Sequence, residues 1–361
     1  MYRRDGEVAF EEVGGVLPPV EEGVPDLNPL GCQKGSGWSV QLSGEDRVTH
    51  PLRRVGERGG GEWERISWDE ALEEIAEAVV EAIDLEGPES ILFEETVEGG
   101  LLTQSPFLRF AGLLGAVTLD ANGLVNDFPT GHHITFGKFS CASTVDDTFH
   151  SDVVLLWHSN PAYTSIPYFH YVTEARYRGA RVVTIAPDYN ASAVFADQYV
   201  PIRPGTDAAL ALGMCQVIIE EGLFDEGFVC SQTDLPLLVL TGTGRFLRGA
   251  DVRAGDREDQ FFCWDPEEGL RPASRATLTL EGARPVLQGR WMVRLHDGSE
   301  VEVTTVFELL RARLDGEYRP EQAAAVCGVP AGVIGGLARL VAGAARRSWR
   351  GSTRRSTTTG T

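Results

Sequence analysis

The chain has 361 residues, of which 42% are hydrophobic, enough to bury the core of one large domain or of two smaller ones. The formal net charge is −21, and because so acidic a surface repels phosphates, nucleic acid is excluded as a partner. The sequence has no run of about eighteen apolar residues, so we expect no membrane-spanning helix. The opening MYRRDGEVAFEEVGG has no apolar stretch after its arginines and does not resemble a signal peptide.

The basic residues are almost all arginine, since only Lys34 and Lys138 are lysines. Many acids with hardly any lysine indicate a halophilic source with GC-rich DNA, and an ordinary acidic protein is the alternative. In either case the acid excess concerns solubility rather than chemistry.

The cysteines are scattered, without a CxxC pair or any short spacing: Cys32, Cys141, Cys215, Cys230, Cys263 and Cys327. This pattern predicts neither a disulfide framework nor, by itself, a zinc site. We expect most of these thiols to be buried as small apolar side chains. Cys32 differs because of the residues around it.

The first elements follow an irregular start at 1–31 that is rich in Pro, Gly and Glu. Ser67 and Glu70 form a capping-box pattern, in which a hydroxyl and a carboxylate satisfy free N–H groups at a helix start. A short strand at 91–93 and a helix at 101–114 come next. The helix after Ser67 carries apolar residues at helical spacing, so we expect one face to pack inward: Trp68, Leu72, Ile75, Ala76, Val79 and Ile83.

Strands and helices alternate between residues 150 and 222. The continuous apolar run VVLLW predicts a parallel strand covered on both faces, and the proline in YVPI favours an edge or a strand end. Strand–loop–helix units in series predict a right-handed parallel α/β sheet. The expected strands are 153–157, 181–185 and 199–202, with one helix ending at Gly179 and another beginning after PGTD at 204–207.

Three polar loops follow these strands: HSNP at 158–161, APDYN at 186–190 and PGTD at 204–207. Parallel α/β sheets bind ligands at the carboxyl ends of their strands. Small residues with oxygen or amide side chains at helix N-termini suit phosphates and a purine edge. No GxGxxG or P-loop is present, so the usual nucleotide fingerprints are missing. Taken singly, Ser159, Asp188 and Asp207 also suit plain helix caps.

Three stretches together, 31–51, 113–137 and 153–222, resemble the large catalytic subunits of the dimethyl sulfoxide reductase superfamily of molybdenum enzymes. The branch most similar contains respiratory nitrate reductase alpha subunits, selenate and (per)chlorate reductases, dimethyl sulfide dehydrogenase and ethylbenzene dehydrogenase. The resemblance implies an α/β fold: a parallel, Rossmann-like region that binds pterin dinucleotides, a second α/β region and a small β-rich insertion.

The first stretch begins GCQKG, residues 31–35. In the family this cysteine is the last of four ligands to a [4Fe–4S] cluster, which makes Cys32 the candidate thiolate; a buried structural thiol is the alternative. Lys34 matches a family position between cluster and pterin, in the electron path. Residues 1–31 contain neither Cys nor His to supply the earlier ligands. We therefore expect a missing N-terminal segment, which would also carry a twin-arginine export signal.

The second stretch contains Asp127, which follows a Gly- and Asn-containing approach and precedes a Phe-Pro turn. In this branch of the family an aspartate at this position ligates molybdenum, and a hard, high-valent metal suits a carboxylate oxygen. A solvated loop carboxylate is the alternative. His132 and His133 would orient the metal's ligands or line the substrate pocket, or they are ordinary loop histidines.

The third stretch matches the family's contacts to its cofactor, molybdenum bis(molybdopterin guanine dinucleotide). A carboxylate at the guanine edge accepts hydrogen bonds from N1–H and from the exocyclic amine. The diphosphate contacts fall on Trp157, Ser159 and Asn160, the guanosine contacts on Pro187 and Asp188, and the guanine-edge contacts on Gly205, Thr206 and Asp207.

The resemblance implies a molybdenum-dependent oxidoreductase that performs oxygen-atom transfer or hydroxylation on a small molecule. Electrons would pass through the pterin, Lys34 and the cluster to an iron–sulfur beta subunit, with a haem b gamma subunit as a further partner. Twin-arginine export and membrane association through these partners are expected of the full-length protein. The alternatives are a Rossmann-like protein that binds an ordinary nucleotide and an inactive fragment with this fold.

The last sixteen residues of the chain are basic, whereas the sequence before them is acidic. Residues 346–361 contain five arginines and no acid, which favours a frameshifted or misassembled end over a natural basic tail. The expected regions are an iron–sulfur domain remnant (1–66), an α/β region with the metal-ligand loop (67–150), the dinucleotide-binding region (151–240), a β-rich insertion (241–304), a helical return segment (305–345) and the aberrant basic tail (346–361).

Overall fold

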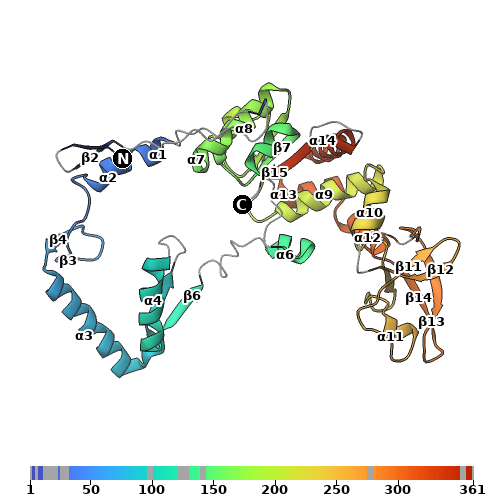
Figure 1. The fold of residues 1–361 in the computed structure, drawn as a ribbon, viewed down its shortest axis with the longest axis horizontal. Coiled ribbons are helices and arrows are strands. Elements are labelled where there is room, and N and C mark those ends of the chain that lie inside the picture. Colours follow the sequence, from blue (N-terminus) through green and yellow to red (C-terminus); the bar gives the residue numbers. More distant parts are fainter. Residues whose placement is uncertain are drawn as a thin grey trace. The chain divides into compact units, whose positions relative to one another are not determined.

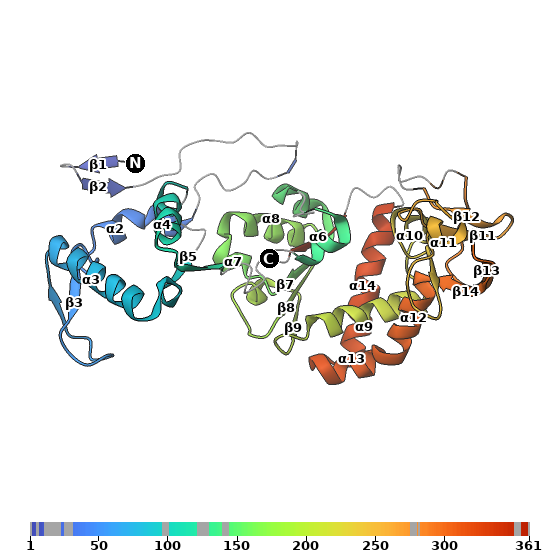
Figure 2. The same ribbon diagram turned by 90° about the horizontal axis from the view of Figure 1, so that it is seen from below.

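The structure, a computed structural model, divides into two compact units (Figures 1 and 2). Unit 1 comprises Met1–Leu17, Asn28–Thr144 and Thr361, and unit 2 comprises Pro18–Leu27 and Val145–Gly360. The residues described by the structure are 2–4, 7–10, 23–24, 32–95, 101–120, 130–138, 144–274, 280, 282–349 and 355–359.

Unit 1 consists of helices and two-stranded sheets. Strands β1 and β2 are antiparallel, as are β3 and β4, whereas β5 and β6 run parallel with α4 as the crossover helix. The strands are β1 (Tyr2–Arg4), β2 (Glu7–Phe10), β3 (Leu52–Arg54), β4 (Trp63–Arg65), β5 (Leu92–Glu95) and β6 (Val117–Asp120). The helices are α1 (Gln33–Ser36), α2 (Trp38–Leu42), α3 (Trp68–Glu86), η1 (Pro88–Ser90), α4 (Leu101–Leu114) and α6 (Thr130–Phe136).

Helix α3 begins at the predicted capping box: Ser67 Oγ accepts a hydrogen bond from Glu70 N–H, and the Glu70 carboxylate accepts one from Ser67 N–H at 2.8 Å. The prediction that its apolar face packs inward is wrong, because Trp68, Leu72 and Ile75 are 65%, 58% and 60% exposed. Periodicity predicts that an apolar face exists but not what covers it. Within the described part of unit 1, Trp68 and Ile75 line a hollow with residues 48–53 and are not packed into a core.

Unit 2 is built around a four-stranded parallel sheet in the order β15–β7–β8–β9. The three predicted strands are confirmed, and β9 lies at an edge, as its proline indicates. The α/β class with a parallel sheet is also confirmed. The elements are η2 (Val145–His150), β7 (Ser151–Trp157), α7 (Pro161–Thr164), α8 (Ile166–Tyr177), β8 (Arg181–Ala186), η3 (Ala193–Phe195), β9 (Gln198–Pro201), α9 (Asp207–Glu220), α10 (Glu226–Gln232) and β15 (Arg355–Thr359).

Both faces of this sheet are covered. Along β7, Val153 and Leu155 pack into a cluster with α9, whereas Val154 and Leu156 pack against α8 on the other face. All four side chains are at most 4% exposed. Alternate residues point to opposite faces of a strand, so a strand covered on both sides must be apolar throughout.

Three helices form the layer with α9 (Figures 1 and 2): α12 (Val306–Glu317), α13 (Pro320–Cys327) and α14 (Ala331–Trp349). Gly213 lets α9 approach its neighbours closely. A Cβ atom at this position would lie 2.8 Å from the Cβ of Ala323 in α13 and 3.2 Å from Cγ2 of Ile334 in α14. The missing side chain is therefore a packing requirement of this layer.

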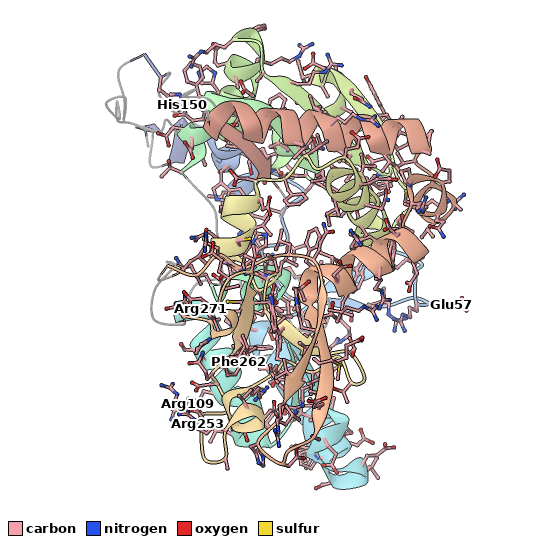
Figure 3. All side chains as sticks on the ribbon, turned by 90° about the vertical axis from the view of Figure 1, so that its right-hand side faces the viewer. Glu57, Arg109, His150, Arg253, Phe262 and Arg271 are labelled. Carbon is pink, nitrogen blue, oxygen red and sulfur yellow. The ribbon has the colours of Figure 1, made fainter. Side chains whose placement is uncertain are left out.

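The region after α10 forms antiparallel β structure with its own core. Strands β10, β14 and β13 form one sheet, and β11 pairs with β12. Phe262 (Figure 3) is 6% exposed, and the rings of Trp264 and Trp291 stack with centroids 4.8 Å apart. The elements are β10 (Leu238–Leu240), α11 (Gly249–Val252), β11 (Phe262–Asp265), β12 (Gly269–Pro272), β13 (Arg290–Arg294) and β14 (Glu300–Thr305).

Among the described residues, no single helix is long and apolar enough to cross a membrane. The bent pair α13 and α14 meets the length and composition criteria together, and its apolar residues belong to the core beneath the sheet.

We predict that Gly213→Ala destabilises unit 2 although alanine favours helices. The added methyl group must displace Ala323 or Ile334, which costs about 1–3 kcal/mol. Thermal and denaturant unfolding measure the change. Gly336→Ala in α14 is the matched control, because nothing lies within 4 Å of its added Cβ. The control should be neutral or more stable by about 0.5–1 kcal/mol; equal destabilisation of both variants would contradict the packing argument.

Candidate functional site

The first and third strand-end loops of unit 2 meet at one carboxylate. Trp157 Nε1 donates a hydrogen bond to Asp207 Oδ1 at 2.6 Å, and His158 Nε2 lies 2.8 Å from the same oxygen. Trp157 ends β7 and packs against the core of the sheet, whereas Asp207 begins α9. The loops are therefore joined at the carboxyl edge of the parallel strands.

The first and second loops are joined by an amide and a hydroxyl. Asn160 Oδ1 accepts hydrogen bonds from Ser192 Oγ at 2.8 Å and from Ser192 N–H at 3.1 Å. Ser192 Oγ in turn accepts a hydrogen bond from Ala162 N–H at 3.1 Å. Ser192 is fully buried, so these bonds satisfy polar groups that water cannot reach and give the two loops a defined spacing.

The third loop is held from the far side by α13. Arg203 N–H donates to Cys327 O at 3.0 Å, and its guanidinium donates to Ala325 O at 2.9 Å. Thr206 Oγ1 donates to Arg203 O at 2.6 Å. Gly205 has a φ of +75° and open space around its Cα, a conformation that glycine adopts without strain.

Ser159, Asp188 and Asp207 also suited plain helix caps by sequence, but their side chains do not cap helices in the structure. Asn160 and Thr206 are the N-cap residues of α7 and α9, and neither side chain makes a cap hydrogen bond. Asp207 instead accepts a hydrogen bond from Trp157, and its Oδ1 lies 2.8 Å from Nε2 of His158. Within the described residues, Ser159 and Asp188 make no side-chain hydrogen bond.

The chemistry of this edge fits the end of a nucleotide. Asp207 offers a carboxylate whose Oδ2 accepts no hydrogen bond within the described part of the chain, so it can accept from a base. The amino end of α9 has no side-chain cap, and the open space at Gly205 permits close backbone approach. Helix N-termini attract phosphate groups through their free N–H groups.

Cys32 and Lys34 lie in unit 1, at the start of α1. Cys32 is the N-cap residue and is half-buried. The backbone N–H groups of Gly35 and Lys34 point to its sulfur and lower the pKa of the thiol below its usual value. A lowered pKa favours the thiolate, the form that binds metals. The side chain of Lys34 is exposed.

Asp127 lies outside the described residues. His132 and His133 lie on helix α6 rather than in a loop, and both are exposed. The His132 ring packs edge-on against Phe136, with centroids 6.1 Å apart. Within the described part of the chain, no group of three His, Cys, Asp or Glu side chains is arranged to hold a metal ion.

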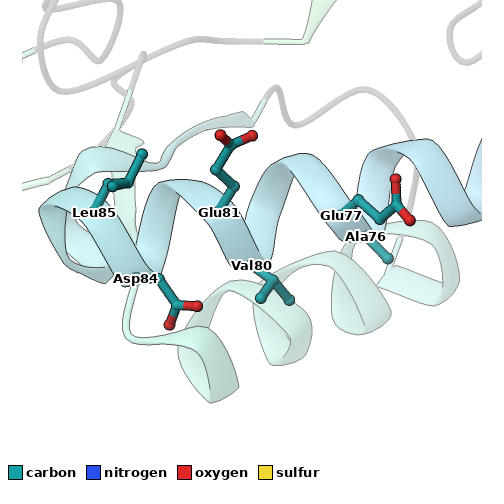
Figure 4. A pocket seen from close by; sticks show the side chains of 6 residues that line it. All are labelled: Ala76, Glu77, Val80, Glu81, Asp84 and Leu85. Carbon is teal, nitrogen blue, oxygen red and sulfur yellow. The ribbon is translucent and has the colours of Figure 1, made fainter.

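A hollow of about 530 Å³ along α3 is lined by three carboxylates and three apolar side chains, and the carboxylates do not converge. Figure 4 shows the carboxylates of Glu77, Glu81 and Asp84 pointing in different directions. Separate acids on a solvated helix face do not make a cation site.

Sequence reasoning singled out neither His158 nor Ser192 as a site residue. His158 stands in the HSNP loop itself, directly after the apolar strand, so its position was a usable signal. Ser192 follows the APDYN loop and has no local signal, because its role comes from the approach of Asn160 across the loops.

Comparison with known proteins places the chain among molybdenum–pterin enzymes. A family model described as molybdopterin oxidoreductase matches residues 47–323. The alpha subunit of dimethylsulfide dehydrogenase from Rhodovulum sulfidophilum is 39% identical and covers 92% of this chain and 37% of its own length. The perchlorate reductase alpha subunit of Dechloromonas aromatica is 38% identical, and the match covers 94% of this chain and 39% of that subunit. The respiratory nitrate reductase alpha subunit of Haloferax mediterranei is 37% identical, and the match covers 89% of this chain and 34% of that subunit.

A solved structure gives a consistent result. Acetylene hydratase from Pelobacter acetylenicus has a TM-score of 0.51 to this chain at 26% sequence identity, covering 91% of this chain and 34% of that protein. The chain thus spans a little over a third of the length of the first three curated relatives, 35–39%.

We predict that Cys32 reacts with iodoacetamide before the buried cysteines of unit 2. The thiolate is the reactive form, and a lowered pKa gives Cys32 more thiolate near neutral pH, whereas burial raises the pKa of Cys230 to about 11. Mass spectrometry of the native chain should show Cys32 modified roughly tenfold faster or more. The difference should shrink as pH rises toward the pKa of Cys230. Equal rates at neutral pH would contradict the assigned environment of Cys32.

Proposed function

Because this chain belongs to the molybdopterin oxidoreductase family, we propose that the carboxyl edge of its parallel, Rossmann-like sheet binds the guanine dinucleotide end of a molybdenum–pterin cofactor. The observation that supports this most is the junction at Asp207, where loops from two strands meet at one carboxylate. An ordinary nucleotide-binding protein is the weaker alternative, since the family itself uses a molybdenum–pterin cofactor.

Asp207 is the guanine-recognising group in this proposal. Guanine presents N1–H and an exocyclic amine on one edge, and a carboxylate with two oxygens accepts from both. Adenine has an acceptor at N1 and cannot make this pair of bonds. Gly205 and Thr206 bring the backbone close to the base, and the Asp207 carboxylate fixes its orientation.

The other two loops bind the remainder of the nucleotide. Trp157, Ser159 and Asn160 approach the diphosphate, and the Asn160–Ser192 bonds hold that loop in place. Pro187 and Asp188, which are exposed on the second loop, contact the guanosine. These residues belong to the region 151–240, which we assign to dinucleotide binding.

Asp127 is proposed as the protein ligand to molybdenum, in an α/β region at 67–150, because a carboxylate oxygen suits a hard metal ion. His132 and His133 on α6 are proposed to orient its ligands or to line the substrate pocket. When bound, the cofactor supplies two-electron oxygen-atom transfer or hydroxylation of a small molecule. Relatives act on dimethylsulfide, perchlorate and nitrate by their names, and small substrates of this kind are proposed here.

Cys32 is proposed as one thiolate ligand of a [4Fe–4S] cluster, with Lys34 between cluster and pterin. The lowered pKa of its thiol suits this role. The named relatives are alpha subunits, so we propose an iron–sulfur beta subunit as electron partner and a haem b gamma subunit beyond it. Export by the twin-arginine route would bring this assembly to the membrane.

We predict that Asp207→Asn abolishes guanine nucleotide retention. The variant keeps the shape of the side chain but places an amide donor against the donors of guanine. Chain purified from molybdate-supplied cells is hydrolysed in acid, and the released GMP is measured. The variant should release at least about tenfold less, because an amide donor that faces the guanine donors leaves both groups unpaired. Asp234→Asn, an exposed carboxylate of the same unit, is the control. Equal GMP release from Asp207→Asn and the wild type would remove the proposed function.

We predict that Asp127→Ala abolishes turnover in the assembled enzyme while leaving GMP content unchanged, because the nucleotide is held by unit 2 and the metal by Asp127. Reduced-dye assays with nitrate, chlorate and a sulfoxide measure turnover. Asp84→Ala on α3, an exposed carboxylate, is the control. Retained turnover in Asp127→Ala would eliminate the ligand assignment.

A further inference from the structure

The indole ring of Trp157 has a single polar group, and that group is already engaged. Nε1–H can donate but cannot accept, and it donates to Asp207 Oδ1 at 2.6 Å. Trp157 ends β7 and packs against the apolar cluster between the sheet and α9, so its ring has little freedom to turn. An N–H that is used in this way is not available to a phosphate oxygen.

The Asp207 carboxylate has few other restraints. Asp207 is the first residue of α9, and rotation about the bond to a carboxylate is broad rather than confined to sharp rotamers. Within the described residues Oδ2 accepts no hydrogen bond, and His158 Nε2 lies 2.8 Å from Oδ1. The His158 side chain is 36% exposed and belongs to no core cluster of the described residues. Trp157 is therefore the neighbour whose position the fold determines.

An anchored carboxylate matters most for a base that donates twice. Guanine presents N1–H and the exocyclic amine side by side, and both bonds form together only when the carboxylate plane lies along that edge. Hypoxanthine keeps N1–H but lacks the amine, so it can bond to one carboxylate oxygen in many orientations. Fixing the plane before binding lowers the ordering cost of the second bond, and this benefits guanine rather than hypoxanthine.

We propose that Trp157 is a positioning residue: its indole N–H fixes the orientation of the Asp207 carboxylate and thereby gives the site its preference for a base with two adjacent donors. The inference rests on the proposed guanine site at Asp207. The side chain of Trp157 acts through this carboxylate, and contact with the diphosphate is left to Ser159, Asn160 and the loop backbone.

The test is a calorimetric titration of the chain with GMP and, separately, IMP, whose base is hypoxanthine. The wild type should bind GMP roughly tenfold more tightly than IMP, the magnitude of one hydrogen bond to a charged group. Trp157→Phe removes the donor and keeps an aromatic ring against the core. This variant should bind GMP roughly fivefold to tenfold more weakly and change IMP binding by less than about twofold. A ring that served packing alone would affect both nucleotides equally.

Trp264→Phe in β11 is the matched control, because it makes the same exchange of rings away from the site. Trp264 stacks on Trp291, and within the described part of the chain its indole N–H has no hydrogen-bond partner. The control should keep the wild-type ratio of GMP to IMP affinity.

A second measurement does not depend on the folding of Trp157→Phe. In the chain labelled with ¹⁵N-tryptophan, the Trp157 indole N–H is assigned as the resonance that Asp207→Ala moves. It should exchange slowly with solvent both before and after GMP is added to the wild type, because Asp207 retains the bond. A shift on GMP addition to the position of a free indole would overturn the positioning role.

Two further outcomes separate this proposal from the guanine site itself. An unchanged ratio of GMP to IMP affinity in Trp157→Phe, or equal affinity of the wild type for both nucleotides, would overturn the positioning role and leave nucleotide binding at this edge intact. Absence of GMP binding to the wild type would overturn both proposals.

Discussion

A single carboxylate oxygen, Oδ1 of Asp207, holds the carboxyl edge of the parallel sheet together. It accepts a hydrogen bond from Trp157 at the end of β7 and lies 2.8 Å from Nε2 of His158, while Asp207 itself begins the helix that follows β9. Strands β7 and β9 are not neighbours, because β8 lies between them. The bond therefore spans the sheet and determines how closely the first and third loops approach. Every role proposed for those loops depends on this approach.

The sheet beneath the edge is rigid for a simple reason: both of its faces are buried. Helix α8 covers one face, and α9, α13 and α14 form the core on the other. The close contact at Gly213 and the Arg203 bonds to the end of α13 connect the helical layer to the third loop. Site geometry is thus determined by packing well away from the loops, as expected for sites placed on rigid elements.

The parts of the fold that were predictable from the sequence are those with local causes. The apolar run of β7, the proline of β9 and the capping box at Ser67 each depend on residues adjacent in the chain, and each prediction is confirmed. The covering of α3 was not predictable, since an apolar stripe does not name its partner. The same limit applies to Ser192, whose partner Asn160 lies 32 residues away.

Resemblance to a family located the three loops but not the state of their side chains. It assigned Asp207 to a ligand, whereas the structure also gives this carboxylate a hydrogen bond from Trp157 and a contact of 2.8 Å with Nε2 of His158, a residue in left-handed conformation. Such an arrangement arises from the convergence of two loops and has no signature in either loop alone.

The central claim, that Asp207 receives a guanine ring at the carboxyl edge of the sheet, is tested most directly by a crystal structure of the chain soaked with GMP. We predict the N1 and amine edge of the base within hydrogen-bond distance of both Asp207 oxygens. A base bound at any other position, away from the Asp207 carboxylate, would contradict the account.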